Sequence, residues 1–527
     1  MSQLVEQRLQ MLADAGLTPV LQRCRKGVEK EALRVTGGGD LARTRHPLAL
    51  GSALTNRYIT TDFSEALLEF VTPAFTSTWE TLQFLCDIHQ FVYRHVGDEL
   101  LWAASMPCLL ESEDAIPVAR YGESNVAKMK TIYRLGLGHR YGRMMQTISG
   151  VHFNFSLPEE FWDHYQELEK DTSRSQDFRS ASYFRLLRNV RRMGWLILYL
   201  FGNSPAICRC FASAEQAGLE EFDKGTLYLP FATSLRMSDL GYKNSSQAGL
   251  DISFDGVDGY VKTLLKAVTT PTPAFQKIGV KVDGEYRQIS ANILQVENEY
   301  YGLVRPKRIV RSGEMPSRAL KHRGVEYVEL RALDVSLLDP AGINQNQMRF
   351  IEAFLIYCLL EDSPLLEARE IQETESNQLL VARQGRKPGL RLSRNGEQVR
   401  LQDWADEICG QLVGISDLLD DGSGSTLYQD ALELQRDAIR DPERIPSAVI
   451  LTEMKKTGES FFTIAQRISE QHKDYFLGLG EEDSLRLQFL TAEAAASIER
   501  QKEIEASDQG SFEEYLHSYF AQAEQLI

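Results

Sequence analysis

Residues 27–35 read GVEKEALRV, and this stretch places two carboxylates, Glu29 and Glu31, in a segment that otherwise has the composition of a buried strand. Side chains of an extended chain alternate between two faces, so both carboxylates share one face with Leu33 and Val35. Burying an unpaired carboxylate costs several kcal/mol or shifts its pKa until it is neutral. The stretch therefore predicts either a cation between the two groups or an edge open to water.

Two further segments repeat this pattern of ionisable groups on a predicted strand. Residues 60–73, TTDFSEALLEFVTP, place Glu69 on an otherwise apolar strand and Asp62 at the turn before it. In SGVHFNFS, residues 149–156, His152 points away from the face that holds the neighbouring phenylalanines.

A fourth strand is predicted over GVEYVELRAL, residues 324–333, where Glu329 and Arg331 share a face with Tyr327 and Leu333. An acidic pair alone means little in a chain with 74 acidic residues. Four strands that each aim carboxylates, an imidazole or a guanidinium from one side are harder to attribute to chance.

The composition is that of an ordinary globular protein, and the formal net charge is -16. This charge argues against a nucleic-acid partner, which would require a basic face, and gives no attraction to anionic lipid. The longest apolar runs, at 195–202 and 354–360, are shorter than the roughly 18 residues that cross a bilayer. We therefore expect neither a nucleic acid nor a membrane as a partner.

The seven cysteines are scattered, and none forms a CxxC pair. Their odd number and the absence of a secretory signal in MSQLVEQRLQMLADAG predict a cytoplasmic protein with reduced thiols. Cys208 and Cys210 could suggest a metal site, but a spacing of two residues without a second pair is poor zinc geometry.

The hydrophobic pattern predicts strands in neighbouring groups rather than a steady alternation of strand and helix, which indicates an α+β fold with an antiparallel sheet. Strands are predicted at 25–35, 57–62, 65–73, 146–157, 288–297, 308–311 and 324–333. Helices are predicted at about 3–15, 77–97, 125–145, 159–168, 178–201, 255–268 and 344–361, with Asn125 as the N-cap of the third. Beyond about residue 400 the pattern is helical, and the predicted domains are a catalytic domain at 1–395 and a helical region at 396–527 packed on it.

If the polar faces converge, they form an oxygen-rich site with one nitrogen, which suits Mg²⁺ or Mn²⁺ better than zinc or copper. The predicted metal ligands are Glu29, Glu31, Asp62, Glu69, His152 and Glu329. Hard divalent ions beside cationic side chains are typical of phosphoryl transfer, and the candidate cations are Lys130, Arg134, Arg236 and Arg331. Neither a P-loop nor a kinase-type glycine loop occurs, so the sheet itself would have to hold ATP.

Each residue also has a purely structural interpretation. Glu29 with Arg34, or Glu329 with Arg331, could be an ion pair on a solvated strand. His152 could be a core histidine with satisfied hydrogen bonds. The aromatic residues near these segments would by default be packing residues; they are Phe63, Tyr133, Tyr242, Tyr300 and Tyr301.

Long collinear blocks of the chain resemble the proteobacterial type of glutamate–cysteine ligase, from about residue 20 to 390. The blocks are GVEKEALRV, GSALTNRYITTDFSEALLEFVTP, SMPC, YRLGLGHRYGRMMQTISGVHFNFSLP, YFRLLRNVRRMGW, YLFGNSPAIC, YLPFATSLRMSDLGY, LQVENEYYGLVRPKR and GVEYVELRALD. The resemblance implies a glutamine-synthetase-like fold, in which an antiparallel sheet forms a funnel for metal ions and ATP and is surrounded by helices. After residue 400 the likeness is mainly one of helical character.

By this resemblance the six predicted ligands are metal-binding, and Arg331 and Arg134 act in catalysis. The implied substrate contacts are Phe63, Tyr133, Leu137, Gln146, Arg236, Tyr242 and Tyr301. The implied reaction uses ATP to convert the γ-carboxylate of glutamate to an acyl phosphate, which the amine of cysteine then attacks. A monomer is expected, with glutamate, cysteine and ATP as its small-molecule partners.

Two rival interpretations stay open at this level. A ligase of the same superfamily could join glutamate to a different amine, because the residues alone do not specify the acceptor. A non-catalytic protein with the same fold would have lost ligands, whereas every acidic position and His152 are present here.

Overall fold

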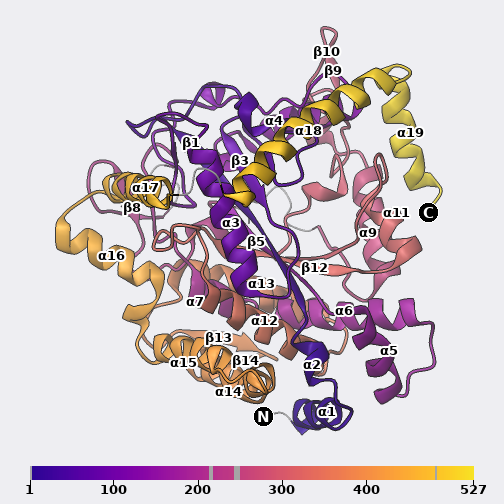
Figure 1. Cartoon of the computed structure of the whole chain (residues 1–527), viewed down its shortest axis with the longest axis vertical. Coiled ribbons are helices and arrows are strands. Elements are labelled where there is room, and N and C mark those ends of the chain that lie inside the picture. Colours follow the sequence, from indigo (N-terminus) through magenta and orange to yellow (C-terminus); the bar gives the residue numbers. More distant parts are fainter. Residues whose placement is uncertain (1–2, 213–217, 242–249, 481–483, 527) are drawn as a thin grey trace.

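The computed structural model describes residues 3–212, 218–241, 250–480 and 484–526. Its centre is a seven-stranded antiparallel sheet with the order β11-β12-β5-β1-β3-β2, in which β4 also pairs with β1 (Figure 1). The strands are β1 (Arg25–Val35), β2 (Ile59–Thr61), β3 (Leu67–Val71), β4 (Leu100–Leu101), β5 (Gly150–Ser156), β11 (Val304–Lys307) and β12 (Tyr327–Asp334). Three small sheets are formed by β6 (Ala206–Cys208), β7 (Glu220–Glu221) and β8 (Thr226–Tyr228), by β9 (Lys281–Val282) and β10 (Glu285–Tyr286), and by β13 (Arg391–Arg394) and β14 (Glu397–Arg400).

Helices surround the central sheet. Before residue 400 they are α1 (Gln3–Asp14), α2 (Thr18–Leu21), α3 (Thr78–Tyr93), α4 (Asn125–Tyr141), α5 (Glu159–Leu168), α6 (Ser175–Met193), α7 (Trp195–Phe201), α9 (Val257–Thr269), α10 (Pro273–Gln276), α11 (Pro316–Arg323), α12 (Gln345–Leu360) and α13 (Ala368–Gln384). After it come α14 (Leu401–Asp420), α15 (Leu427–Arg440), α16 (Pro446–Thr457), α17 (Phe461–Gly478), α18 (Leu485–Ser507) and α19 (Phe512–Glu524). The predicted α+β class and the helical C-terminal region are therefore confirmed.

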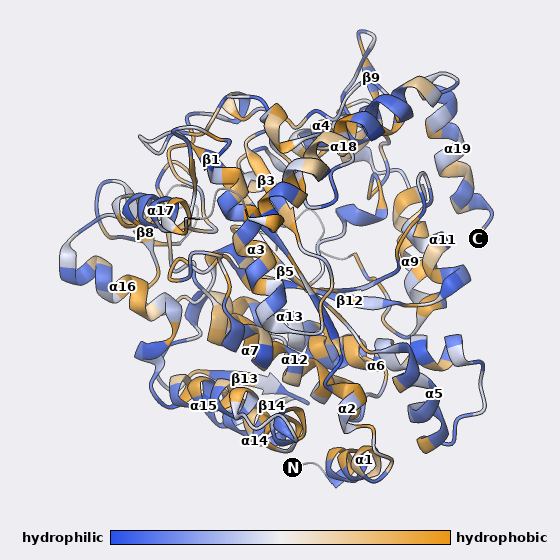
Figure 2. Ribbon diagram, in the orientation of Figure 1, coloured by the Kyte–Doolittle hydropathy of each residue, from blue (hydrophilic) through white to orange (hydrophobic). Residues whose placement is uncertain are grey.

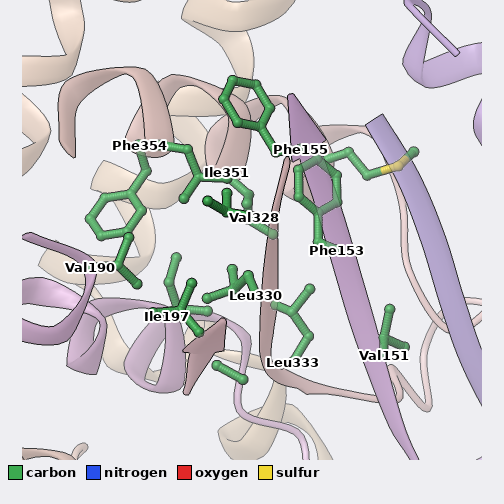
Figure 3. Packing of buried hydrophobic residues seen from close by; sticks show 14 of the residues in the cluster. Val151, Phe153, Phe155, Val190, Ile197, Val328, Leu330, Leu333, Ile351 and Phe354 are labelled. Atoms are coloured by element: carbon green, nitrogen blue, oxygen red, sulfur yellow. The ribbon is translucent and has the colours of Figure 1, made fainter. Parts of the chain in front are cut away.

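One face of the sheet is apolar and packs on α6, α7 and α12. Figure 3 shows Phe153 and Phe155 of β5 and Leu330 of β12 among side chains of these helices. The alternation of β5 and β12 sends these residues to the core and sends His152 and Glu329 to the opposite face. The sheet thus separates a large hydrophobic core from a polar face.

The C-terminal helices pack on elements that surround or belong to the sheets rather than apart from them. α14 and α15 pack on α12, α17 contacts β4 and β6, and α18 and α19 reach α3 and α4. Figure 2 shows hydrophilic and hydrophobic residues alternating along α14 and α15, as expected for helices with one face in solvent. Among the residues described, no helix has both the length and the apolar character needed to cross a bilayer.

The strand predicted at 288–297 is wrong, because this segment is an irregular loop. Its backbone bonds largely to the C-terminal end of α9 rather than to a strand, because the amides of Ile293 and Leu294 donate to the carbonyls of Thr270 and Ala267. Buried glutamines add side-chain hydrogen bonds. Gln288 donates to the carbonyls of Phe275 and Gly279, and the amide of Ile289 donates to Gln295. Side-chain hydrogen bonds of this kind compete with sheet ladders. The strand predicted at 308–311 is also misplaced, since β11 occupies Val304–Lys307.

Three finer predictions need correction. The helix predicted at 178–201 is split into α6 and α7 at Gly194, whose missing side chain leaves room for Leu303. The N-cap of α4 is Ser124 rather than Asn125, because its side chain accepts from the amide of Ala127. A register shift in β12 between Leu330 and Leu333 turns Leu333 into the apolar core and away from the face of Glu329.

Candidate active site

The polar face of the sheet is built around the two glutamates of β1. In the strand register, Glu29 lies opposite His152 of β5, and Glu31 lies opposite Glu69 of β3. Directly opposed residues on one face have neighbouring side chains. Three strands therefore bring four of the six predicted ligands together, although they are up to 123 positions apart in sequence.

The tightest group consists of Glu29, His152 and Glu329, whose ligand atoms all lie within 4.8 Å of one another. His152 Nδ1 is 3.3 Å from Glu29 Oε2 and 3.9 Å from Glu329 Oε1. Asn154 donates to Glu29 Oε1 at 2.8 Å and orients that carboxylate. Carboxylate oxygens with a single imidazole nitrogen fit Mg²⁺ or Mn²⁺.

A second, looser group contains the remaining acids, and His152 connects the two. His152 Nε2 is 3.9 Å from Glu31 Oε1, and the backbone amide of Gly150 donates to Glu31 Oε2 at 2.6 Å. The charge of Asp62 raises the pKa of Glu31, and the charge of Glu31 raises the pKa of Glu69, so the three carboxylates are close neighbours. All six predicted ligands therefore lie on one face, in two neighbouring groups.

The ionisation of the second group indicates an excess of negative charge. Burial, followed by the charge of Asp62, raises the pKa of Glu31 to about 8. Burial and the neighbouring carboxylates of Glu29, Asp62 and Glu31 raise the pKa of Glu69 well above its ordinary value. These carboxylates lack enough cationic partners within the protein, which is the condition that a bound divalent cation would relieve.

The first group is better compensated. Burial is the largest influence on Glu29 and would raise its pKa, but the hydrogen bond with His152 and the charges of Lys307 and His152 together lower it. At Glu329 burial is likewise outweighed, chiefly by Lys307 and Arg331, so the pKa falls well below its ordinary value. Burial and the charge of Arg331 lower the pKa of His152, which keeps the ring neutral as metal ligation requires.

Cationic side chains meet Glu329 at one end of this face. Arg331 Nη1 lies 3.2 Å from Glu329 Oε2 and 3.4 Å from His152 Nδ1, while Lys307 Nζ is 3.3 Å from Glu329 Oε1. Arg305 lies directly opposite Glu329 in the β11–β12 register. The sequence analysis missed Lys307 and Arg305 because it placed this strand four residues too late.

Two structural interpretations raised from the sequence can now be compared with the geometry. Arg34 does not pair with Glu29, since its guanidinium bonds to Glu99 at 2.6 Å on the other side of the strand. The pair of Glu329 and Arg331 does form, but Glu329 is buried rather than solvated. The carboxylates of β1 are therefore not part of an exposed ion-pair ladder.

The helix α4 supplies the wall next to the acidic face. Arg134 donates to the carbonyl of Asp62, and its guanidinium lies 4.6 Å from the ring centre of Tyr121. Lys130 Nζ lies 5.0 Å from the centre of the same ring. Burial raises the pKa of Tyr133 well above its ordinary value, which keeps its hydroxyl protonated.

Apolar and aromatic site residues gather in one cluster on this side of the sheet. Phe63 and Leu137 are buried in it, and Tyr133 and Tyr301 pack against it. Tyr301 is hydrogen-bonded to Gln146 at 3.0 Å. These residues, predicted from separate segments, form a continuous wall.

Arg236 lies between the acidic face and a neighbouring cavity. It occupies the space in which a side chain at Gly150 would sit, and its Nη2 donates to the carbonyl of Arg331 at 3.3 Å. Asp334 Oδ1 is 3.8 Å from its Nη1. Tyr242, the remaining predicted contact, lies outside the described residues.

The cavity next to Arg236 has a volume of about 610 Å³. Arg236, Tyr301 and Arg331 line it, together with residues 250–254 and the α13 segment 368–379. The sequence analysis gave no indication of the last two segments, because neither contains a polar motif of its own. The cavity opens the acidic face to a ligand larger than a metal ion.

Comparison with known proteins gives consistent matches over the whole chain. Residues 9–381 match the family described as glutamate-cysteine ligase. A glutamate–cysteine ligase of Alcanivorax borkumensis is 49% identical over 98% of this chain and 99% of its own length. One from Pseudomonas paraeruginosa is 46% identical over the full length of both chains.

Solved structures agree with this match. The crystal structure of a glutamate–cysteine ligase from Francisella tularensis in complex with AMP has a TM-score of 0.90 at 34% identity and covers 96% of this chain and 99% of its own. A bifunctional glutathione synthetase from Pasteurella multocida has a TM-score of 0.72 at 22% identity and covers 94% of this chain and 58% of its own, which indicates a shared fold.

Proposed function

The chain belongs to the glutamate–cysteine ligase family, and from this premise we propose that it joins the γ-carboxylate of L-glutamate to the amine of L-cysteine at the expense of ATP. The products are γ-glutamylcysteine, ADP and inorganic phosphate, in the first step of glutathione biosynthesis. The observation that supports this proposal best is the gathering of six metal-capable side chains on one face of the sheet, beside Arg331 and Lys307.

Mg²⁺ or Mn²⁺ would be held by Glu29, His152 and Glu329 and by the neighbouring group of Glu31, Asp62 and Glu69. When bound, the divalent cation would neutralise charge on the β- and γ-phosphates of ATP. Arg331 and Lys307 add fixed positive charge at the same end of the face. Protein cations held in place before the reaction stabilise charge as it develops.

The first chemical step transfers the γ-phosphoryl group of ATP to the γ-carboxylate of glutamate and releases ADP. Activation is needed because a carboxylate repels nucleophiles and has no adequate leaving group. We assign Arg236 and Gln146 to glutamate, since both lie between the acidic face and the cavity or wall that border it. Arg134, fixed by the carbonyl of Asp62, faces the same region.

In the second step the amine of cysteine attacks the acyl phosphate, an amide forms and phosphate leaves. The wall formed by Phe63, Tyr133, Leu137 and Tyr301 would receive the cysteine side chain. Its low polarity would also keep water away from an intermediate that hydrolyses readily. Tyr242 is proposed as a further contact in this pocket.

The cavity of about 610 Å³ is proposed to receive the nucleoside part of ATP. Its volume is in the range of small-molecule sites, and Arg331 connects it with the acidic face. The crystal structure of the Francisella tularensis relative contains AMP, which supports use of an adenine nucleotide.

The proposed metal ligands and substrate contacts precede residue 335, and the α13 segment that lines the cavity lies at 368–379. Both observations support a catalytic domain at 1–395 and an accompanying helical region at 396–527. We propose a monomer as the functional unit. We also propose that the enzyme works in the cytoplasm, where its small-molecule substrates are found.

The direct test supplies the enzyme with ATP, Mg²⁺ and glutamate and compares three acceptors: cysteine, 2-aminobutyrate and ammonia. We expect ADP release to be most efficient with cysteine, with γ-glutamylcysteine as the product. Equal kcat/KM values for cysteine and ammonia would reject the acceptor assignment and favour a ligase for another amine. No glutamate-dependent ADP release with any amine would favour a non-catalytic protein.

A further inference from the structure

The last two helices of the chain contain none of the proposed site residues, yet they run beside the segments that carry several of them. In Figure 1, α18 runs past α3, and α19 continues from it toward the C-terminus. α18 contacts α3 and the turn at Leu48–Leu50, and α19 contacts α4. We call α18, α19 and the turn between them the C-terminal strap, residues 485–524.

The first contact of the strap is with residues 50–57, the segment that leads into β2 and then to Asp62 and Phe63. The amide of Ser52 donates to Ser497 Oγ at 2.9 Å, and the amide of Arg57 donates to Glu493 Oε1 at 3.1 Å. Gly51 has a φ of +84°, and a side chain there would lie 2.3 Å from Ser497 Oγ. The backbone of residues 50–57 therefore packs closely against α18.

The second contact is with the N-terminus of α4. The backbone amide of Asn125, the first residue of the helix, donates to Asp508 Oδ2 at 2.6 Å, and its side chain donates to Asp508 Oδ1 at 3.3 Å. The first amides of a helix have no partner within it and favour a negative charge. Asp508 thus adds a second cap, from the far end of the chain, to the local cap by Ser124.

The third contact is apolar and reaches the proposed site directly. Leu516 of α19 forms a small hydrophobic cluster with Ile289 and Val296, against which Met129, Ile132 and Tyr133 of α4 pack. Tyr133 also packs against the cluster that contains Phe63 and Leu137. Tyr133 therefore packs against two clusters, one that contains Leu516 of the strap and one that contains Phe63 and Leu137 of the wall proposed for cysteine.

We propose that the C-terminal strap is a positioning element for the amine acceptor, with Asp508 and Leu516 as its positioning residues. The strap holds α4 at its N-terminus and along its side, and it holds the segment that precedes Asp62 and Phe63. Arg134 joins these two parts through the carbonyl of Asp62. Displacements of about 1 Å in such walls are enough to change binding and catalysis.

This inference rests on the proposed function, because it names cysteine as the acceptor. It requires that damage to the strap act on the acceptor before it acts on ATP or glutamate, because the strap packs directly on Tyr133 of the wall proposed for cysteine. On the sheet, His152 contacts Glu29 and Arg331, and Arg331 and Lys307 pair with Glu329; these residues come from β1, β5, β11 and β12.

The test compares two leucine truncations in the full-length enzyme. Leu516→Ala removes packing behind Tyr133, whereas Leu9→Ala removes an equally buried leucine of α1 in the main core, outside the strap. Both variants should lower the melting temperature. Only Leu516→Ala should raise the KM for cysteine, by about two- to thirty-fold, the range over which packing changes commonly couple to a site.

A second pair of variants, at Asp508, tests the proposal even if Leu516→Ala does not fold. Asp508→Ala should raise the KM for cysteine and leave the KM for ATP and glutamate within about two-fold. Asp508→Asn should recover much of the wild-type KM, because an amide oxygen still accepts from the amide of Asn125. A parallel rise of all three KM values, or an unchanged KM for cysteine despite a lower melting temperature, would overturn the proposal. Failure of the proposed function would instead appear in the wild-type enzyme, as a lack of preference for cysteine.

Discussion

The two faces of β1 carry charges of opposite sign that are handled in different ways. On the core face, Lys26 Nζ lies 2.6 Å from Glu352 Oε1, and Arg34 Nη1 lies 2.6 Å from Glu99 Oε2. On the other face, Glu31 faces Glu69, another carboxylate. Lys26 and Arg34 on the core face each have a carboxylate partner within the protein, and Lys30 between them lies 2.8 Å from His89 Nε2. Glu31 and Glu69 instead oppose each other.

This difference distinguishes charged residues that stabilise the fold from charged residues that bind a ligand. A buried cation with its own carboxylate contributes to the native structure and costs stability only when one partner is removed. Carboxylates whose pKa values are raised by burial and by one another, as for Glu31 and Glu69, work against folding unless a ligand compensates them. We therefore interpret the second face as built for a cation that the chain itself does not supply.

The largest effect is expected from breaking the core-face pair of Lys26 and Glu352. Glu352→Gln leaves the fully buried Lys26 ammonium without a counter-charge, and the expected loss is about 3–5 kcal/mol of unfolding free energy in urea titrations. Activity per folded molecule should stay near the wild-type value, because neither residue lies on the site face.

The double variant Lys26→Met with Glu352→Met is the matched control. It removes both charges, so most of the lost stability should return. A large fall in turnover without a loss of stability in Glu352→Gln would contradict the division between the two faces.

The next effect concerns the site face. Glu29→Gln keeps the size of the side chain but weakens the ligand group, and ATP turnover should fall by roughly 100-fold or more, since even residues that support metal ligands are worth 10–100-fold. The melting temperature should change little, because the amide keeps the size of the side chain and can still hydrogen-bond to His152 and Asn154. Unchanged turnover would refute a metal role for Glu29.

A smaller effect is expected in the pH dependence of stability without divalent ions. The folded protein holds a proton on Glu31 up to about pH 8, whereas an ordinary glutamate releases it near 4.5. The folded state therefore binds more protons in this window, and its unfolding free energy should fall as the pH rises from 4.5 to about 8. Glu69 should act in the same direction.

Mg²⁺ or Mn²⁺ should reverse this loss, because it binds the ionised carboxylates of the native state alone. Thermal unfolding between pH 5 and 8 with and without metal measures both effects. Stabilisation by metal that is equal at both ends of the range would contradict the assignment of Glu31 and Glu69.

Much of the site could be predicted from the sequence, because strand alternation determines which side chains share a face. The alternation in GVEKEALRV and SGVHFNFS was sufficient to bring Glu29, Glu31 and His152 to one face. The pattern could not reveal that Leu333 leaves this face, since a register shift within β12 has no signal in the residues that surround it.

Other features depend on distant parts of the chain and were inaccessible to local reasoning. The segment 288–297 has a hydrophobic pattern that resembles a strand, but its backbone bonds to the end of α9, and Gln288 and Gln295 form further tertiary hydrogen bonds. Lys307 became recognisable as a neighbour of Glu329 only when the β11–β12 register was known. The cap that Asp508 provides for α4 joins residues 383 positions apart.

The most direct test of the central claim is a titration with Mn²⁺ followed by electron paramagnetic resonance. The wild-type protein should bind Mn²⁺ saturably, and Glu31→Gln should weaken that binding. Glu297→Gln should leave it unchanged, because Glu297 is also a buried glutamate with a raised pKa but is held by the amide of Ser317. Equal Mn²⁺ affinity in the wild type and Glu31→Gln, or no binding by the wild type, would contradict the account.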